Sequence, residues 1–329
     1  MKSKSFITPL TFLVIAIVVS ICPAKDKPKP PEPPAFSTPE SAGPDFPLQG
    51  EYAGSAGGAK VGADVIALGN DTFRLVVHQR GLPGAGWDGS AKSEMEGKRT
   101  GENVAFKGAW EAVLSNAGLG GKTDKGEEIN LKRVERQSPT EGAKAPAGAV
   151  ILFDGSNADA WQDGRMDPRK LLFCGTKTKE AFQSFDLHIE FLLPFKPLAR
   201  GQGRGNSGVY LQDRYEVQVL DSFGLKGEDN ECGGIYHNSA PKVNMCYPPL
   251  QWQTYDIDFT AATFDASGKK TKNAVVTLKH NGTIVQDHLE LKSATPGGGF
   301  ENEVPAPGQI QLQNHENPVY YRNVWLVKK

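Results

Sequence analysis

The chain has 329 residues, with 37 Lys and Arg against 38 Asp and Glu, so its formal net charge is −1. This balance gives no electrostatic reason to expect a nucleic-acid partner, and the sequence has no basic arm, zinc-finger spacing or aromatic RNA-binding motif. The 37 glycines and 23 prolines, with few stretches of helical periodicity, predict a turn-rich protein of the all-β class.

Residues 1–24 have the anatomy of a secretory signal peptide. Lysines precede an apolar run over about residues 6–21, and small residues follow it. An uncleaved anchor is the alternative, which the interruption by Pro9 disfavours, and "VVSIC" at Cys22 matches a lipoprotein site poorly. We expect an exported protein of the periplasm or cell envelope, or a secreted one, that meets a membrane only through an uncleaved or lipidated N-terminus.

The remaining chain divides by composition into a tether and two β domains. Residues 25–45 are rich in proline and predict an extended tether, and the short β segments of residues 46–136 predict a small β domain. A polar linker over residues 137–148 leads to a larger domain at residues 149–329. Its many alternating strands, one pair joined by a type I′ turn at Asn281–Gly282, predict two antiparallel sheets packed as a β-sandwich.

Polar side chains gather on one face of a predicted hairpin in the larger domain. In "GRGNSGVYLQDRYEVQVLDSFG" (203–224), strand periodicity directs the valines to one face and Asn206, Tyr210, Glu216 and Gln218 to the other. Exposure to water would also account for such a face in an antiparallel sheet. Long carboxamides and a tyrosine, in place of lysine and threonine, favour ligand binding instead.

The last strand segment shows the same division. Gln311 and Gln313 share a face with Gln309, opposite the apolar Ile310, and His315 follows them. A solvent-exposed strand face more often carries charge or threonine than three glutamines, so we predict a binding role.

Export would permit disulfides, and Cys232 with Cys246 is the candidate pair, which leaves Cys174 unpaired. Spacing alone does not establish the bridge. The absence of a C-x-x-C spacing disfavours a metal site built from these thiols.

The larger domain resembles a known family. The ordered blocks "FDGSNADAW", "FDLHIEFLLP", "GNSGVYL", "YEVQVLDS", "GGIY", "WQTYDIDF", "TLKHNGTIVQ" and "LQNHENPVYYRNVWL" are similar to the 3-keto-disaccharide hydrolase domain family over about residues 149–329. The resemblance implies a concanavalin-like jelly roll with a concave polar sheet, and substrates that are glycosides oxidised to a ketone at C3. The short "DGRMDPRKLLFCGTKTKEAF" connection and the long "KPLARGQGRGNSG" loop depart from the commoner family pattern.

A C3 ketone changes the chemistry of glycoside cleavage. It acidifies the C2 hydrogen, so that one base can form an enediolate and expel the glycosidic oxygen from C1, after which water can add back. Such a site needs a base, positive charge beside the oxyanion and an acid for the leaving group. A glycosidase acting through an oxocarbenium-like transition state instead needs two carboxyl groups.

Candidate roles follow from these needs. Glu216 is the first choice for the base or a metal ligand, and His315 is the second group for proton transfer. Arg322 is a candidate for positive charge at the enediolate, with a structural ion pair as its alternative. Candidates for binding the substrate are Asn206, Tyr210, Gln218, Gln311, Gln313 and, at the pocket rim, His237.

A divalent metal ion is a candidate cofactor, with Glu216, His237 and His315 as its candidate ligands. A nucleotide cofactor is not expected, because "GQGRGNSG" precedes a strand and does not open a helix. The predicted function is that of an exported hydrolase or lyase acting on 3-keto-glycosides. A non-catalytic, lectin-like carbohydrate-binding protein of the cell envelope is the alternative.

Overall fold

The computed structural model describes residues 32–300 and 302–329. Strands dominate this part of the chain, and its helices are short 3-10 turns at Pro39–Ser41, Phe46–Leu48 and Gly201–Gly203. The all-β prediction is therefore confirmed. No helix of the described part is long and apolar enough to cross a membrane. The predicted signal peptide and the start of the predicted tether lie outside the described residues.

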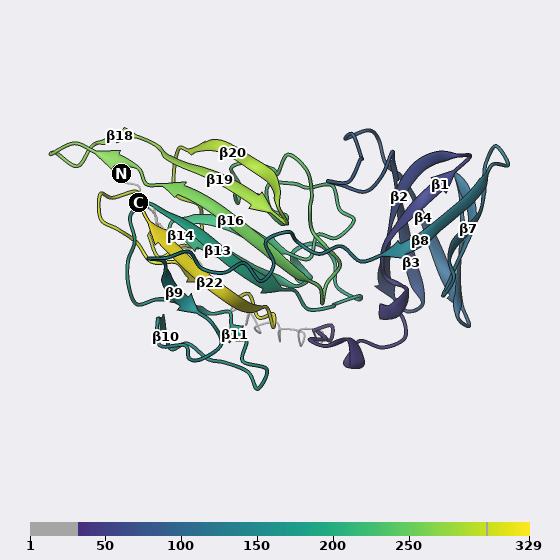
Figure 1. Cartoon of the computed structure of the whole chain (residues 1–329), viewed down its shortest axis with the longest axis horizontal. Coiled ribbons are helices and arrows are strands. Elements are labelled where there is room, and N and C mark those ends of the chain that lie inside the picture. Colours follow the sequence, from purple (N-terminus) through teal and green to yellow (C-terminus); the bar gives the residue numbers. More distant parts are fainter. Residues whose placement is uncertain (1–31, 301) are drawn as a thin grey trace, which may run out of the picture. The chain divides into compact units, whose positions relative to one another are not determined.

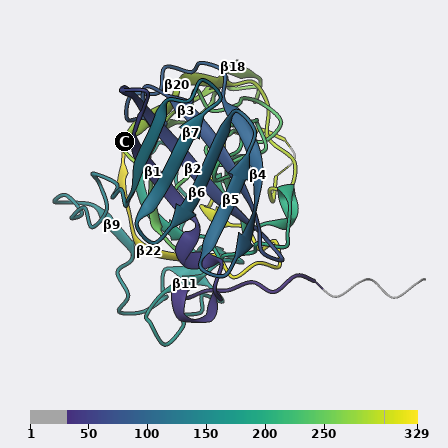
Figure 2. The same ribbon diagram turned by 90° about the vertical axis from the view of Figure 1, so that its right-hand side faces the viewer.

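Eight antiparallel strands form a closed barrel within the range predicted for the small β domain (Figure 2). Its strands are β1 (Gly50–Ala56), β2 (Ala59–Gly69), β3 (Thr72–Gln79), β4 (Ser93–Thr100), β5 (Asn103–Lys107), β6 (Trp110–Ser115), β7 (Gly118–Thr123) and β8 (Glu128–Val134). The barrel closes because β1 pairs with β8 as well as with β2. Alternate side chains such as Phe73, Phe106 and Leu131 form one buried cluster. Closure itself was not predicted from the sequence.

The larger domain is a sandwich of two antiparallel sheets, as predicted (Figure 1). The five-stranded sheet has the order β10 (Trp161–Gln162), β12 (Thr176–Thr178), β21 (Gln311–Leu312), β14 (Asn206–Leu211) and β15 (Tyr215–Leu220). The seven-stranded sheet has the order β11 (Leu172–Phe173), β22 (Tyr320–Lys328), β13 (Phe185–Leu192), β16 (Trp252–Thr260), β19 (Ala274–His280) and β20 (Thr283–Leu291), with β9 (Val150–Phe153) paired to β22. A separate ribbon contains β17 (Thr263–Phe264) and β18 (Lys270–Lys272).

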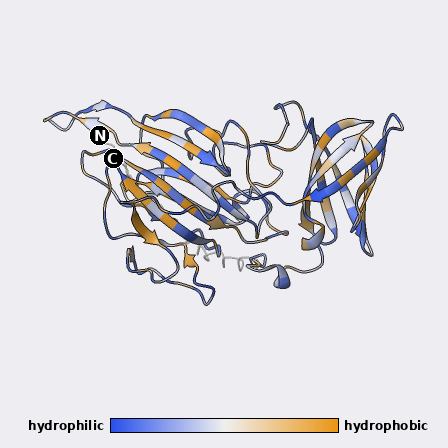
Figure 3. Ribbon diagram, viewed as in Figure 1, coloured by the Kyte–Doolittle hydropathy of each residue, from blue (hydrophilic) through white to orange (hydrophobic). Residues whose placement is uncertain are grey.

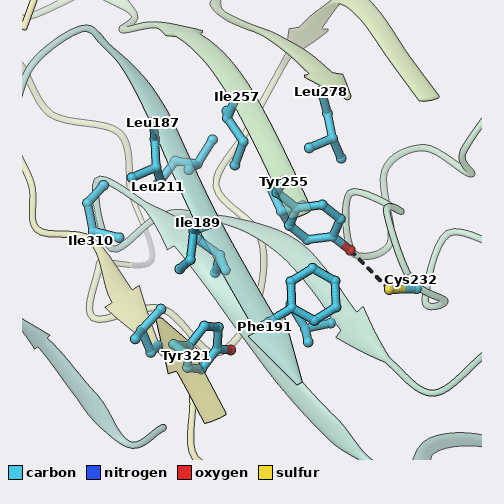
Figure 4. Close-up of a cluster of buried hydrophobic side chains, with 14 of the residues drawn as sticks. Leu187, Ile189, Phe191, Leu211, Cys232, Tyr255, Ile257, Leu278, Ile310 and Tyr321 are labelled. Carbon is cyan, nitrogen blue, oxygen red and sulfur yellow. Dashed lines mark hydrogen bonds between the residues drawn. The ribbon is translucent and has the colours of Figure 1, made fainter. Parts of the chain in front are cut away.

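The hydrophobic core lies between the two sheets of the sandwich. Leu187 and Phe191 of β13 face Leu211 of β14 in one buried cluster (Figure 4), and hydrophilic and hydrophobic residues alternate along these strands (Figure 3). Each such side chain contributes about 2 kcal/mol by leaving water. Tyr255 of β16 also links the sheets, because its hydroxyl donates a hydrogen bond to the carbonyl of Gln218 at 2.6 Å.

The predicted turn between β19 and β20 is confirmed. Asn281 and Gly282 have φ angles of 49° and 79°, which are the left-handed values that a type I′ turn requires at both central positions.

The predicted disulfide is not formed. Cys232 and Cys246 are free and buried thiols, as is Cys174. Burial raises the pKa of Cys246, and the neighbouring Cys232 thiol raises it further. The two sulfur atoms are therefore near one another, but no bond joins them.

The end of the predicted tether is packed and not extended into solvent. Phe36 and Phe195 exchange two backbone hydrogen bonds of 2.9 Å, and the rings of Phe36 and Phe46 lie 6.2 Å and 5.3 Å from the ring of Phe195. Ala42 is only 4% exposed. Aromatic side chains thus anchor a segment whose proline content predicted a mobile chain.

The predicted linker also has defined contacts, which lie along the outer face of the seven-stranded sheet. Thr140 donates a hydrogen bond to Asp256 Oδ2 at 2.7 Å, and the backbone amide of Gly142 donates one to Glu190 Oε1 at 2.6 Å. Residues 137–148 are therefore part of the folded structure.

Glu190 is a buried carboxylate held by donors. Burial acts to raise its pKa, but hydrogen bonds from His188, Asn323, Arg322 and the amide of Gly142 outweigh burial and lower the pKa from 4.5 to about 2. Because the folded-state pKa is depressed, the resulting stability is present above pH 4.5 and is lost as the pH falls through 2.

We therefore expect Glu190→Gln to lower the free energy of unfolding by about 3 kcal/mol at pH 7, and by progressively less as the pH falls towards 2. Chemical denaturation at several pH values measures this. Glu180→Gln, which removes an exposed ion pair to Lys328, is the matched control and should change stability by less than about 1 kcal/mol. A loss of stability in Glu190→Gln that does not vary with pH would contradict the lowered pKa of Glu190.

Candidate functional site

The strand register brings the predicted polar residues to one face. In the hairpin of β14 and β15, Tyr210 is opposite Glu216, and Gly208 is opposite Gln218, while Val209 and Val217 enter the core. Three of these side chains have almost no contact with bulk water. Tyr210, Glu216 and Gln218 are 0%, 2% and 1% exposed, so simple solvation does not account for their polarity.

Two loop segments bind the backbone of Glu216 at the edge strand β15. Thr295 accepts a hydrogen bond from the backbone amide of Glu216 at 2.8 Å, and the amide of Tyr236 donates one to the carbonyl of Glu216 at 3.2 Å. The chain segments around Thr295 and Tyr236 thus fix the backbone position of Glu216.

The Glu216 side chain lies over Gly208. A Cβ atom at residue 208 would be 2.2 Å from Glu216 Oε1, so only glycine leaves room for this conformation. Oε2 accepts a hydrogen bond from the Tyr210 hydroxyl at 2.8 Å. Oε1 has no hydrogen-bond partner among the described residues and is not one of the unpaired polar atoms sealed from solvent, so it keeps a small solvent-accessible surface.

Burial controls the ionisation of this carboxyl. Burial raises the pKa of Glu216 from 4.5 to about 7, and the hydrogen bond from Tyr210 offsets only part of the rise. Burial and the nearby Glu216 charge also raise the pKa of Tyr210 far above its ordinary value. Near neutral pH, Tyr210 is therefore a neutral donor beside a carboxyl that exchanges a proton readily.

A polar hollow of about 520 Å³ is lined by two residues that contact Tyr210. Its volume is in the range of small-molecule sites. Gln313 and Gly297 line the hollow and also approach the Tyr210 hydroxyl, to which Gln313 Nε2 donates a hydrogen bond at 3.4 Å. The predicted residue Gln311 lies on its wall, together with Gln162, Lys177 and Asn314. This carboxamide-rich wall suits hydrogen bonding to sugar hydroxyls.

The other two predicted amides bind one another. Gln218 Nε2 donates to Asn206 Oδ1 at 2.9 Å, and Asn206 Nδ2 donates to the carbonyl of Gln202 at 3.0 Å. Asn206 is 1% exposed. These contacts stiffen the end of the hairpin.

The structure does not bring the predicted histidines to the Glu216 carboxyl. His315 follows β21 and is exposed, and exposed His237 packs its ring against Tyr236, with ring centroids 4.2 Å apart. Across residues 32–300 and 302–329, no three His, Cys, Asp or Glu side chains are grouped so that they could hold a metal ion. Glu216, His237 and His315 therefore do not form the predicted ligand set.

Arg322 is also elsewhere, and this corrects its predicted catalytic role. It belongs to β22 of the seven-stranded sheet, where it donates hydrogen bonds to Glu190 at 2.6 Å and to Glu141 at 2.7 Å. Its guanidinium lies 3.9 Å from the centre of the Trp252 ring. The structural ion pair, the alternative for this arginine, is what the geometry shows.

Sequence reasoning missed several contributors to the site. Tyr236 lies close enough to raise the pKa of Tyr210 further, and Lys177 is 3.4 Å from Asp213 at the hairpin turn. The position of Tyr236 at the end of the "GGIY" block was a usable signal. Nothing in the sequence pattern indicated that Thr295 and Gly297, far along the chain, would approach the hairpin.

Comparison with known proteins extends these observations. Residues 148–327 match the model of the 3-keto-alpha-glucoside-1,2-lyase-like domain. A crystal structure from Parabacteroides distasonis ATCC 8503, provisionally named a glycosyl hydrolase, has 31% sequence identity and a TM-score of 0.53, covering 64% of this chain and 98% of that chain. A second structure from that organism, named in the same way, has 16% identity and a TM-score of 0.41, covering 55% and 94%. No curated protein matches the chain.

The family match extends from the sequence just before β9 into β22 and so includes both sheets of the sandwich and the Glu216 hairpin. It confirms the resemblance predicted for residues 149–329. The chain belongs to the family of 3-keto-alpha-glucoside-1,2-lyase-like domains, which places it among carbohydrate-active proteins of the glycosyl hydrolase type.

Proposed function

We propose that this protein cleaves 3-keto-glycosides, with Glu216 as the base that removes the C2 proton. The observation that carries the proposal is the buried Glu216 carboxyl, whose pKa is about 7 and which is linked through the Tyr210 hydroxyl to Gln313, a wall residue of the carboxamide-lined hollow of about 520 Å³. A base works best when its pKa is near the working pH, because it is then both ionised and able to hold the proton.

The reaction balances with one carboxyl group. Ionised Glu216 takes the C2 proton, and the electrons of the C–H bond pass to the C3 ketone to give an enediolate. Their return forms the C1=C2 double bond and breaks the bond from C1 to the glycosidic oxygen. The protonated Glu216 can then give that proton to the departing oxygen. Addition of water across C1 and C2 completes a net hydrolysis.

Asp213, the other carboxyl group near the hairpin, is occupied by structural contacts, and this supports a mechanism with one base. Asp213 is 1% exposed, lies 3.4 Å from Lys177 and accepts a hydrogen bond from the amide of Gly299 at 2.9 Å. Its oxygens thus hold the neighbouring segment in place. A glycosidase that acts through an oxocarbenium-like transition state needs two carboxyl groups at the scissile bond.

We also propose that the protein is exported, because residues 1–24 have the pattern of a signal peptide. N-terminal sequencing of the protein from its native host tests this. Cleavage near residue 24 supports export, whereas an intact first methionine on a cytoplasmic protein contradicts it.

The first prediction concerns activity. Wild-type protein should release the aglycone from a 3-keto-glucoside and not from its unoxidised parent, and Glu216→Gln should lower the rate by about 10²- to 10⁴-fold, as for the loss of a general base. Glu102→Gln, the same change in the exposed β4–β5 turn, is the control and should retain full activity.

Each arm of this assay is repeated with a chelator, because a divalent cation would stabilise the enediolate as a Lewis acid. Loss of the rate on chelation, with recovery on adding metal, would support the predicted metal ion. Binding of the sugars without cleavage of either one, under every metal condition, would favour the lectin-like alternative.

The second prediction concerns stability. The folded-state pKa of Glu216 is raised from 4.5 to about 7, so the carboxyl costs stability as the pH rises through that interval. The free energy of unfolding of Glu216→Gln should therefore be about 3 kcal/mol higher than that of wild type at pH 8, and about equal to it at pH 4. Urea denaturation at both pH values measures this. Destabilisation at pH 8 would show that the carboxylate is paired in solution.

The third prediction tests the position of the carboxyl. Gly208→Ala places a methyl group where Glu216 Oε1 lies, so the side chain must swing away. We expect a loss of activity of at least about 10²-fold, because small displacements of a catalytic group are costly. Gly203→Ala, at a glycine whose added Cβ would meet nothing within 4 Å, is the control. Full activity of Gly208→Ala would place the chemistry elsewhere.

A further inference from the structure

The contacts of Tyr210 differ from those of a side chain that binds a sugar substrate. Its side chain is completely buried, and its hydroxyl is 2.8 Å from Glu216 Oε2 and 2.8 Å from the carbonyl of Pro296. Gln313 Nε2 donates a hydrogen bond to the same oxygen at 3.4 Å. The one proton of this hydroxyl already faces two acceptors, and its complete burial leaves no exposed surface for a substrate to contact.

Packing fixes the position of the phenol. A Cβ atom at Gly297, where φ is +86°, would lie 2.6 Å from the Tyr210 hydroxyl. The segment that carries Gly297 is fastened to the hairpin by Thr295, whose amide donates to the carbonyl of Arg214 at 2.8 Å. The hydroxyl therefore has little freedom to turn away from Glu216.

We propose that Tyr210 is the positioning residue of Glu216: its hydroxyl orients the carboxyl and favours the ionised form that acts as the base. This replaces the sugar-binding role predicted for Tyr210, and it rests on the proposed function of Glu216. A hydrogen bond to a carboxylate is stronger than one to a neutral acceptor. The single proton of Tyr210 thus goes to Glu216 when that carboxyl is ionised, and to the carbonyl of Pro296 when it is protonated.

Other titratable groups also face this pair. Tyr236 from the loop after β15, and Asp213 at the hairpin turn, both act to raise the pKa of Tyr210. Asp213 is itself near Lys177 of β12. From the opposite sheet, buried Tyr321 has its pKa raised in part by Glu216. In the described part of the chain, no cationic side chain contributes to the pKa of Glu216, whereas the hydrogen bond from Tyr210 lowers it. Tyr210 is therefore the group whose removal should change the ionisation of Glu216 most.

Tyr210→Phe removes one oxygen atom and tests this role. The acid limb of the kcat/KM profile should move to higher pH by about one unit, because the carboxylate loses its donor. At pH 7 the rate should fall about fivefold, because the ionised fraction of Glu216 falls by that factor, while KM changes little, since the phenol does not touch the sugar. Tyr215→Phe, on the neighbouring strand β15, is the matched control: its hydroxyl donates a hydrogen bond to the Glu303 carboxylate, and the loss of that hydroxyl should leave the profile unmoved.

A direct titration separates this inference from the proposed function. Carbon-13 NMR of glutamate-labelled protein, with Glu216→Gln to assign the signal, follows the carboxyl without any substrate. A higher Glu216 pKa in Tyr210→Phe supports the inference even if no 3-keto-glucoside is cleaved. An unchanged pKa, or a raised KM with an unmoved profile, would overturn it and restore the sugar-ligand role.

Should Tyr210→Phe fail to fold, Gln313→Leu provides a second test. It removes the donor that polarises the Tyr210 hydroxyl, so the Glu216 pKa should rise in the same direction by a smaller amount. No change, or a fall, in that pKa would count against the proposal.

Discussion

The burial of the Glu216 carboxyl, with no lysine or arginine of residues 32–300 and 302–329 acting on its pKa, is the constraint around which the site is built. Burial raises its pKa to about 7, and the Tyr210 hydroxyl is the group that opposes the rise. Glu190, on the other sheet, is equally buried, yet its donors hold its pKa at about 2. Two glutamates in one sandwich thus differ through their hydrogen-bond donors: one is a fixed structural anion, and the other can exchange a proton at neutral pH.

The fold supplies this environment through contacts between distant parts of the sequence. Gly208 leaves space for the carboxyl beside its own strand, and Thr295 binds the Glu216 amide from almost eighty residues further along the chain. Tyr255 ties the hairpin to the opposite sheet through the Gln218 carbonyl. Such support from rigid strands and packed neighbours is what holds a reactive group in one orientation.

Strand alternation was sufficient to predict that Tyr210, Glu216 and Gln218 share a face, because the side-chain period of a strand is two. It could not predict that this face is buried, since the covering segments come from separate loops. Arg322 was proposed for its positive charge, which does not indicate which sheet its strand joins. That strand lies in the seven-stranded sheet, where the arginine pairs with Glu190. Barrel closure depends on pairing between β1 and β8, which no local pattern encodes.

A carboxyl that is unfavourable to bury at neutral pH is informative because a neutral side chain would be more stable in the same place. Gln218, on the same strand and face, shows that a carboxamide is accommodated there with ordinary hydrogen bonds. Stability alone would favour glutamine at residue 216 as well. A glutamate with one oxygen bound by Tyr210 and the other without a described partner is better explained by a need for proton transfer than by folding. The same reasoning separates it from Glu190, whose replacement has only a structural cost.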